Sequence, residues 1–143
     1  MKRMLRPGLV LLLALVLMGM GGFDFNEKAG EIPTPDKEVI ATITDVEGTL
    51  ITLNQFSLNG QTVLNGKLGA GKVAIPFSQI KVLTIWPESK ALQAKVELID
   101  QSIQTLSLDR GQTAFGRLKF GIYQIRIEQL KRVEIGSVSE KKK

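Results

Sequence analysis

Residues 66–85 read GKLGAGKVAIPFSQIKVLTI and residues 116–135 read GRLKFGIYQIRIEQLKRVEI, and these two stretches decide the fold. They align at an offset of fifty residues. Identical residues then coincide at Gly66 and Gly116, Gly71 and Gly121, Ile75 and Ile125, Gln79 and Gln129, Lys81 and Lys131, and Ile85 and Ile135. Self-similarity at a fixed period of this length indicates a repeated structural unit. The sequence therefore predicts two copies of one unit.

Outward from these stretches, short runs rich in Val, Ile, Leu and Thr alternate with polar residues and are broken by Gly, Asn and Asp, a pattern typical of strands. Asn59-Gly60 fits a tight hairpin turn, since both residues tolerate positive φ. Single helical turns are expected at 78–80 and 128–130. The predicted strands are 39–44, 49–56, 61–68, 72–77 and 81–86 in the first copy, and 94–99, 102–108, 112–118, 121–127 and 131–135 in the second.

The expected fold class is all-β, with two tandem five-stranded units at residues 38–86 and 94–135 of a β domain that spans 38–136. Two small SH3-like or Sm-like barrels and one pseudo-symmetric β-sandwich both fit the pattern. A unit of this size without disulfides buries little surface, so we expect the two copies to share one core. One extra residue between Thr62 and Gly66 predicts a β-bulge near Asn65.

Strand alternation assigns side chains to faces. Pro76 falls on the outward side of its strand, where its missing N–H predicts a sheet edge or a bulge. On the next strand the outward places are Val82, Thr84 and Trp86, whereas the second copy has Arg132, Glu134 and Gly136 there. The asymmetry predicts that this face is covered, with the second copy as the preferred cover and a partner that binds at Val82, Thr84 and Trp86 as the alternative.

The two ends of the chain differ from the body. Lys2, Arg3 and Arg6 precede an apolar run from Leu9 to Met18, which is typical of a secretory signal peptide over residues 1–22. An uncleaved N-terminal anchor is the alternative. Residues 23–37 are expected to form a linker and residues 137–143 a basic, disordered tail. The sequence thus predicts export, with a periplasmic or cell-envelope location in a bacterium.

Charge and composition narrow the function classes. The chain has 19 Lys and Arg against 14 Asp and Glu, but six of the cations lie in the signal peptide and the tail, so the body is nearly neutral. The high pI therefore does not indicate a nucleic-acid surface. There is no His and no Cys, which removes the usual general base and the common nucleophiles and metal ligands. We expect no cofactor and no metal.

The glycine-rich segment 66–72 imitates part of a phosphate-binding loop. Val73 stands where Ser or Thr is required, and a strand follows where a helix is needed. Turn glycines explain the spacing, so we expect no nucleotide site.

Three function hypotheses remain. The preferred one is a non-catalytic interaction or structural module that contacts another envelope protein or a second copy of itself, with β-strand addition at an exposed edge as the mode. Membrane contact is expected only through the N-terminal segment or Lys141–Lys143. The alternatives are a cell-wall or lipid hydrolase that uses carboxylates such as Glu97 or a Ser78–Lys81 dyad, and an Sm-like nucleic-acid binder. Basic residues cluster in the second copy, but the aromatic residues beside them are expected inside the fold: Phe115, Phe120 and Tyr123.

Overall fold

The computed structural model describes residues 33–140, and this part of the chain folds into antiparallel strands and two short 3₁₀ turns. The all-β prediction is confirmed. None of the helical turns in the described residues is long and apolar enough to cross a bilayer. The elements in chain order are β1 (Lys37–Asp45), β2 (Leu50–Leu58), β3 (Val63–Leu68), β4 (Gly71–Pro76), η2 (Phe77–Gln79), β5 (Ile80–Glu88), β6 (Ala91–Leu98), β7 (Ile103–Leu108), β8 (Thr113–Leu118), β9 (Gly121–Arg126), η3 (Ile127–Gln129) and β10 (Leu130–Glu140).

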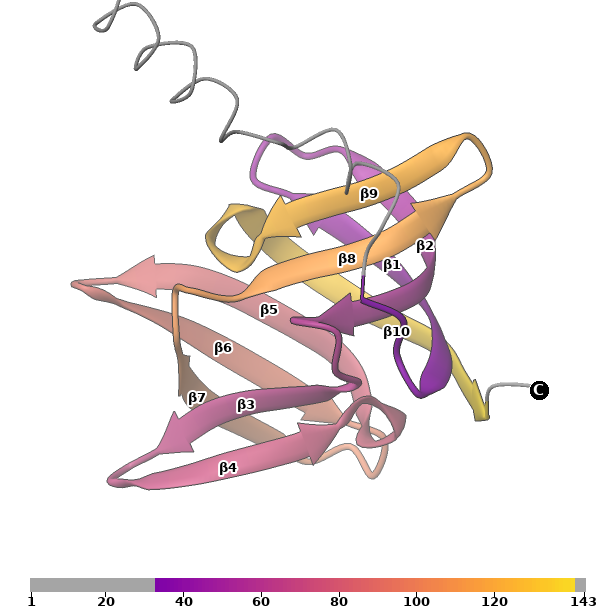
Figure 1. Ribbon diagram of the computed structural model, residues 1–143. Coiled ribbons are helices and arrows are strands. Elements are labelled where there is room, and N and C mark those ends of the chain that lie inside the picture. Colours follow the sequence, from indigo (N-terminus) through magenta and orange to yellow (C-terminus); the bar gives the residue numbers. More distant parts are fainter. Residues whose placement is uncertain (1–32, 141–143) are drawn as a thin grey trace, which may run out of the picture. The chain divides into compact units, whose positions relative to one another are not determined.

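The strands form one curled sheet of ten strands in the order β4-β3-β7-β6-β5-β10-β1-β2-β8-β9 (Figure 1). This order has an internal symmetry. If each strand is exchanged for its counterpart in the other half, β1 for β6, β2 for β7 and so on, the result is the same order read from the other end. The repeat in the sequence therefore appears in the sheet as two related ends, which meet where β5 pairs with β10.

The grouping into two tandem units is not what the sheet shows. β3, β4 and β5 of the first half associate with β6 and β7 of the second half, while β1 and β2 pair with β10 and β8 (Figure 1). Only an isolated bridge between Leu58 and Gln61 links β2 to the start of β3. The two halves thus exchange strands rather than folding side by side as separate copies.

The β5–β6 hairpin produces this exchange. β5 continues past Trp86 and turns tightly at Ser89-Lys90, so that Glu88 pairs with Ala91. Ser89 adopts a positive φ of 54°, as a tight hairpin turn requires. Pro87 does not stop β5, because it pairs with Leu92 next to the hydrogen-bonded pair at the turn and needs no N–H there.

One contiguous hydrophobic core joins the two halves. Buried side chains come from both ends of the sheet, including Leu53 of β2 and Leu106 of β7, each at most 1% exposed. Phe77 and Ile127 are buried at equivalent places in η2 and η3. Val73, Ile75, Tyr123 and Ile125 are partly buried and pack against this core.

The extra residues of the first half lie in β2 and not near Asn65, so the predicted bulge was placed wrongly. β3 pairs with β4 in unbroken register from Val63 to Leu68. Between Leu53 and Leu58, however, β2 holds four residues, where β7 has one residue between Leu106 and Leu108. The β2–β8 register breaks there, and Gln55 takes a positive φ of 52°.

β10 is longer than the sequence indicated. It runs to Glu140, and residues 137–140, which were expected to belong to a disordered tail, pair with β1. Gly136 bulges out of the register beside Ile40, and the ladder then continues as far as Lys37 and Glu140. Backbone pairing holds this segment although only Val138 contributes to the core. The predicted signal peptide and Lys141–Lys143 lie outside the described residues.

Candidate interaction surfaces

The sheet ends in two hairpins, and the outer strand of each hairpin is paired on one side only. β4 is the first strand and β9 the last, and no strand in residues 33–140 pairs with their outer sides. In β9, Gly121 pairs with Leu118 across the turn as a hydrogen-bonded pair, so alternate residues starting at Ile122 direct their N–H and C=O groups away from β8. The outward groups belong to Ile122, Gln124 and Arg126. An unpaired edge of this kind is a template for another extended chain.

The β4 edge is blunted where the β9 edge is not. Pro76, which pairs with Val63 at the end of β4, has no N–H to offer. The prediction that Pro76 lies on an edge strand is confirmed. Arg126 has the same place in β9 and nearly the same backbone, with φ −72° and ψ 145° against −60° and 143° at Pro76. The two edges therefore have similar backbones, but the β4 edge lacks the backbone N–H donor that Arg126 supplies on the β9 edge.

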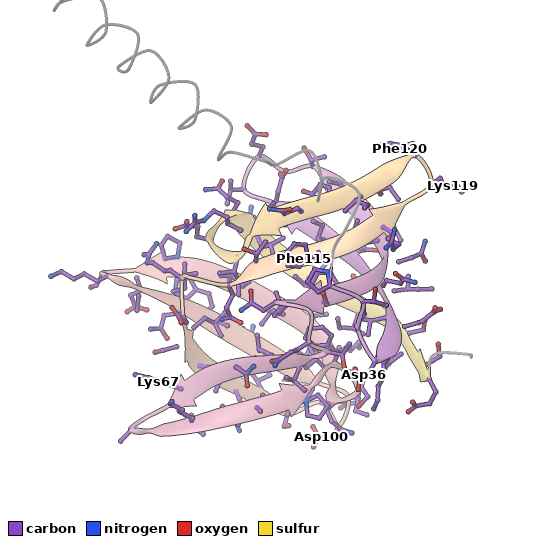
Figure 2. The ribbon with its side chains drawn as sticks, viewed as in Figure 1. Asp36, Lys67, Asp100, Phe115, Lys119 and Phe120 are labelled. Carbon is purple, nitrogen blue, oxygen red and sulfur yellow. The ribbon has the colours of Figure 1, made fainter. Side chains whose placement is uncertain are left out.

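The tip of the β8–β9 hairpin carries an aromatic side chain in water. Figure 2 shows Lys119 and Phe120 at the end of the hairpin, where Phe120 is 89% exposed. The expectation that Phe120 lies inside the fold was wrong, because it occupies the second position of the turn. The repeat contained this signal, since Phe120 aligns with Ala70 between the hairpin glycines Gly69 and Gly71.

β9 also offers a partly covered apolar row. Tyr123 and Ile125 face the core but are only half-buried, and among residues 33–140 no further strand pairs with β9 on that side. Burial raises the pKa of the Tyr123 hydroxyl above its usual value of 10.0, and the negative charge of Asp45 adds to the shift. A tyrosine hydroxyl is protonated at neutral pH even at its usual pKa, so the phenol can donate a hydrogen bond.

The predicted partner-binding residues lie together on the outer face of β5, in the middle of the sheet. Val82 is 9% exposed, and Thr84 and Trp86 are half-buried. Each is flanked across the ladder: Val82 by Glu97 and Glu134, Thr84 by Lys95 and Arg132, and Trp86 by Gln93. Long polar side chains thus surround this face, and the binding role of the three residues stays a prediction.

Charged residues of the second half are partly paired with each other. Arg126 Nε lies 2.9 Å from Glu128 Oε1, and Arg132 Nη1 lies 3.2 Å from Glu134 Oε2. Lys119 and Lys131 are exposed at separate places, on the hairpin tip and on β10. The basic cluster that the sequence suggested is therefore interrupted by acidic partners.

The residues considered for catalysis lie on three different elements. Ser78 is in η2 and is exposed, Lys81 is exposed on β5, and Glu97 is on β6 opposite Val82. No group of three or more His, Cys, Asp or Glu gathers anywhere in residues 33–140 in an arrangement that could hold a metal ion. The glycine-rich segment 66–72 runs from β3 through a two-residue turn into β4.

A groove of about 740 Å³ lies over β3, β4 and the ends of β6 and β7. Sequence reasoning missed it, because its walls come from five separate places in the chain. It is lined by Asn59, Asn65, Gly66, Lys67, Lys72, Ala91, Ser107, Leu108, Asp109 and Gln112. Its volume lies within the range of about 300–1,000 Å³ that is usual for ligand pockets.

The chain belongs to a protein family whose description is "Uncharacterised protein", and the family model matches residues 35–137. This match covers nearly the whole β domain. No curated protein and no solved structure matches the chain.

Proposed function

We propose that this protein is a non-catalytic interaction module of the bacterial cell envelope, which binds an extended segment of another envelope protein by β-strand addition to β9. The observation that carries the proposal is the unpaired β9 edge, with outward N–H and C=O groups at Ile122, Gln124 and Arg126. Export is supported by the basic and apolar residues at the N-terminus.

The side chains at the edge suit an added strand. A partner strand beside β9 would place alternate side chains next to Tyr123 and Ile125, which are half-buried and have no neighbouring strand on that side within the described part of the chain. Main-chain hydrogen bonds would supply affinity and the apolar row would supply specificity. Phe120 at the tip gives the bound segment a further apolar contact.

Arg126→Pro tests the proposal. The residue already has a φ of −72°, and its counterpart in the other hairpin is Pro76, so proline fits the backbone. The change removes one outward N–H and puts a ring in the path of an added strand. Arg126→Ala is the matched control, because it removes the charge and the ion pair with Glu128 but keeps the N–H.

The measurement begins with short peptides selected from a random library against the full chain. We expect selected peptides to slow hydrogen exchange at the amides of Ile122, Gln124 and Arg126. Arg126→Pro should weaken their binding by about tenfold or more, while Arg126→Ala should change it little. Protection elsewhere, or equal binding by both variants, would contradict strand addition at β9.

The natural partner is then identified by photo-crosslinking in cells. A reactive side chain at Gln124 should form an adduct with one envelope protein, and the same group at Ala74 on β4 should not. An adduct between two copies of this chain would make β9 a self-association edge. Crosslinks from position 86 and not from position 124 would instead move the interaction to the Trp86 face.

A further inference from the structure

The groove over β3 and β4 contains two lysines that face each other directly. Lys67 on β3 pairs with Lys72 on β4, and both line the groove. They form a non-hydrogen-bonded pair, since the adjacent Leu68 and Gly71 flank the turn, and side chains approach most closely in such pairs. Like charges directly opposite on a sheet are destabilising. Two facing lysines are therefore a local cost to the fold.

The described residues do not relieve this cost. The ion pairs in residues 33–140 involve Lys37, Arg110, Arg126 and Arg132, and neither groove lysine takes part. Asp109 is the single carboxylate in the lining, and its Oδ1 accepts a hydrogen bond from the Gly111 amide. The equivalent pair in the other hairpin is Arg117 and Ile122, in which only one residue is charged.

Polar groups surround the lysines. Ser107 lies directly beside Lys67 across the β3–β7 ladder, and its Oγ is 3.2 Å from Gln93 Nε2, which donates to it. The Ser107 hydroxyl proton is therefore free to point toward a ligand. Asn59 accepts a hydrogen bond from the Thr113 amide through Oδ1, which leaves its amide group to donate. The groove lining thus combines two cations with uncharged donors.

A buried side chain adds an acceptor on the same wall. Gln112 is 7% exposed, and its Nε2 donates to the Asp109 carbonyl at 3.1 Å, which fixes the orientation of the amide. Its Oε1 stays available to a hydroxyl or amide donor. A ligand that matches these groups has an anionic end and neutral polar groups beside it.

We propose that this groove binds a polar ligand through a carboxylate or phosphate group held between Lys67 and Lys72, with hydroxyl groups of the ligand at Ser107 and Gln112. The bound oxyanion would neutralise the two facing lysines, and hydrogen bonds to charged groups are the stronger kind. Lys67 projects from β3 near the hairpin turn in Figure 2, where a ligand can reach it from solvent. This site is independent of the β9 edge.

Three small probes of similar size test the proposal by NMR titration of the isotope-labelled full chain: glucuronate, glucose 6-phosphate and glucose. We expect saturable shift changes at Lys67, Lys72 and Ser107 with one or both anionic probes and none with glucose. Saturation by glucuronate alone identifies a carboxylate site, and by glucose 6-phosphate alone a phosphate site. No saturable change with either anion at millimolar concentration would overturn the proposal.

Lysine variants then separate a specific site from general attraction to charge. Lys67→Gln and Lys72→Gln should each weaken binding about tenfold. Arg117→Gln, at the place in β8 that corresponds to Lys67, should leave binding unchanged. Lys72→Gln should also raise the temperature of unfolding without ligand, because it removes the like-charge contact. Equal loss with Arg117→Gln would show nonspecific attraction and overturn the proposal.

Discussion

The β3–β4 and β8–β9 hairpins occupy equivalent places at the two ends of the sheet, yet they end it differently. Both run from a glycine on the inner strand, Gly66 or Gly116, through a two-residue turn. The first carries facing lysines and finishes at Pro76, which blunts its edge. The second carries Phe120 at its tip and leaves its edge amides free. One backbone plan thus supports two surfaces with different chemistry.

The halves differ inside the molecule as well. The four residues between Leu53 and Leu58 include Phe56 and Ser57, both buried, whereas β7 has only Ser107 between Leu106 and Leu108. Phe56 packs against Phe77 with ring centroids 5.5 Å apart and planes tilted by 31°. The hydroxyl of Ser57 is buried and has no hydrogen-bond partner among the described residues. The pseudo-symmetry therefore describes the strands, while the core of the first half contains an aromatic pair that the second half lacks.

The largest expected effect tests this aromatic pair. Phe56→Ala should lower the free energy of unfolding by about 3–5 kcal/mol, because a fully buried ring leaves a cavity and Phe77 loses its neighbour. Phe120→Ala is the matched control and should change stability by less than about 0.5 kcal/mol, since Phe120 is exposed. Urea unfolding measures both. Similar losses of stability for Phe56→Ala and Phe120→Ala would mean that the extra residues of β2 do not contribute to the hydrophobic core.

A smaller effect is expected at the paired glycines. A Cβ at Gly116 would come within 2.7 Å of Leu53 Cβ, and the nearest atom at Gly66 would be Ser107 O at 3.0 Å. Gly116→Ala should therefore cost about 1–3 kcal/mol, and Gly66→Ala less, because overpacking forces the neighbour to move. The two variants are compared by the midpoints of their urea unfolding curves, provided that the free energy of unfolding depends on urea concentration with the same slope in both. A larger loss at Gly66 would contradict the closer approach of β2 to β8.

The smallest effect concerns two equivalent turns, one between β1 and β2 and the other between β6 and β7. In the β6–β7 turn, Asp100 Oδ1 accepts hydrogen bonds from the Ser102 hydroxyl and amide, and these bonds, the hydroxyl first, hold the pKa of Asp100 below 3.8. In the β1–β2 turn, Asp45 Oδ1 accepts only backbone donors, from Glu47 and Thr49. The side-chain hydroxyl is thus peculiar to the second half.

Ser102→Ala should raise the pKa of Asp100 toward 3.8 and leave part of the depression, because the amide bond stays. A pKa lowered by folding stabilises the protein at pH values above the unfolded pKa, and this contribution is lost as pH falls through the folded pKa. The variant should therefore lose less stability than wild type on acidification from about pH 4. Carboxyl NMR titration gives the pKa directly, and an unchanged value would contradict the role of the hydroxyl.

Only a small part of the candidate interaction surface could be read from particular residues. Pro76 indicated an edge strand, because a residue without N–H is tolerated there and not inside a ladder. Phe120 was misjudged although its alignment with Ala70 placed it in a turn. The groove could not be predicted, since Asn59, Lys67, Ser107 and Gln112 meet only after β3 pairs with β7.

The sequence by itself determined the all-β class, the positions of the ten strands and the inward faces, because strand alternation and turn residues act locally. It also determined that Gly66 and Gly116 are equivalent. Only the tertiary structure decided which strands pair across the halves. Hydrogen bonding in a sheet is the same for any strand of suitable length, so partner choice depends on how β5 continues past Pro87 into β6 and on which pairing closes a common core.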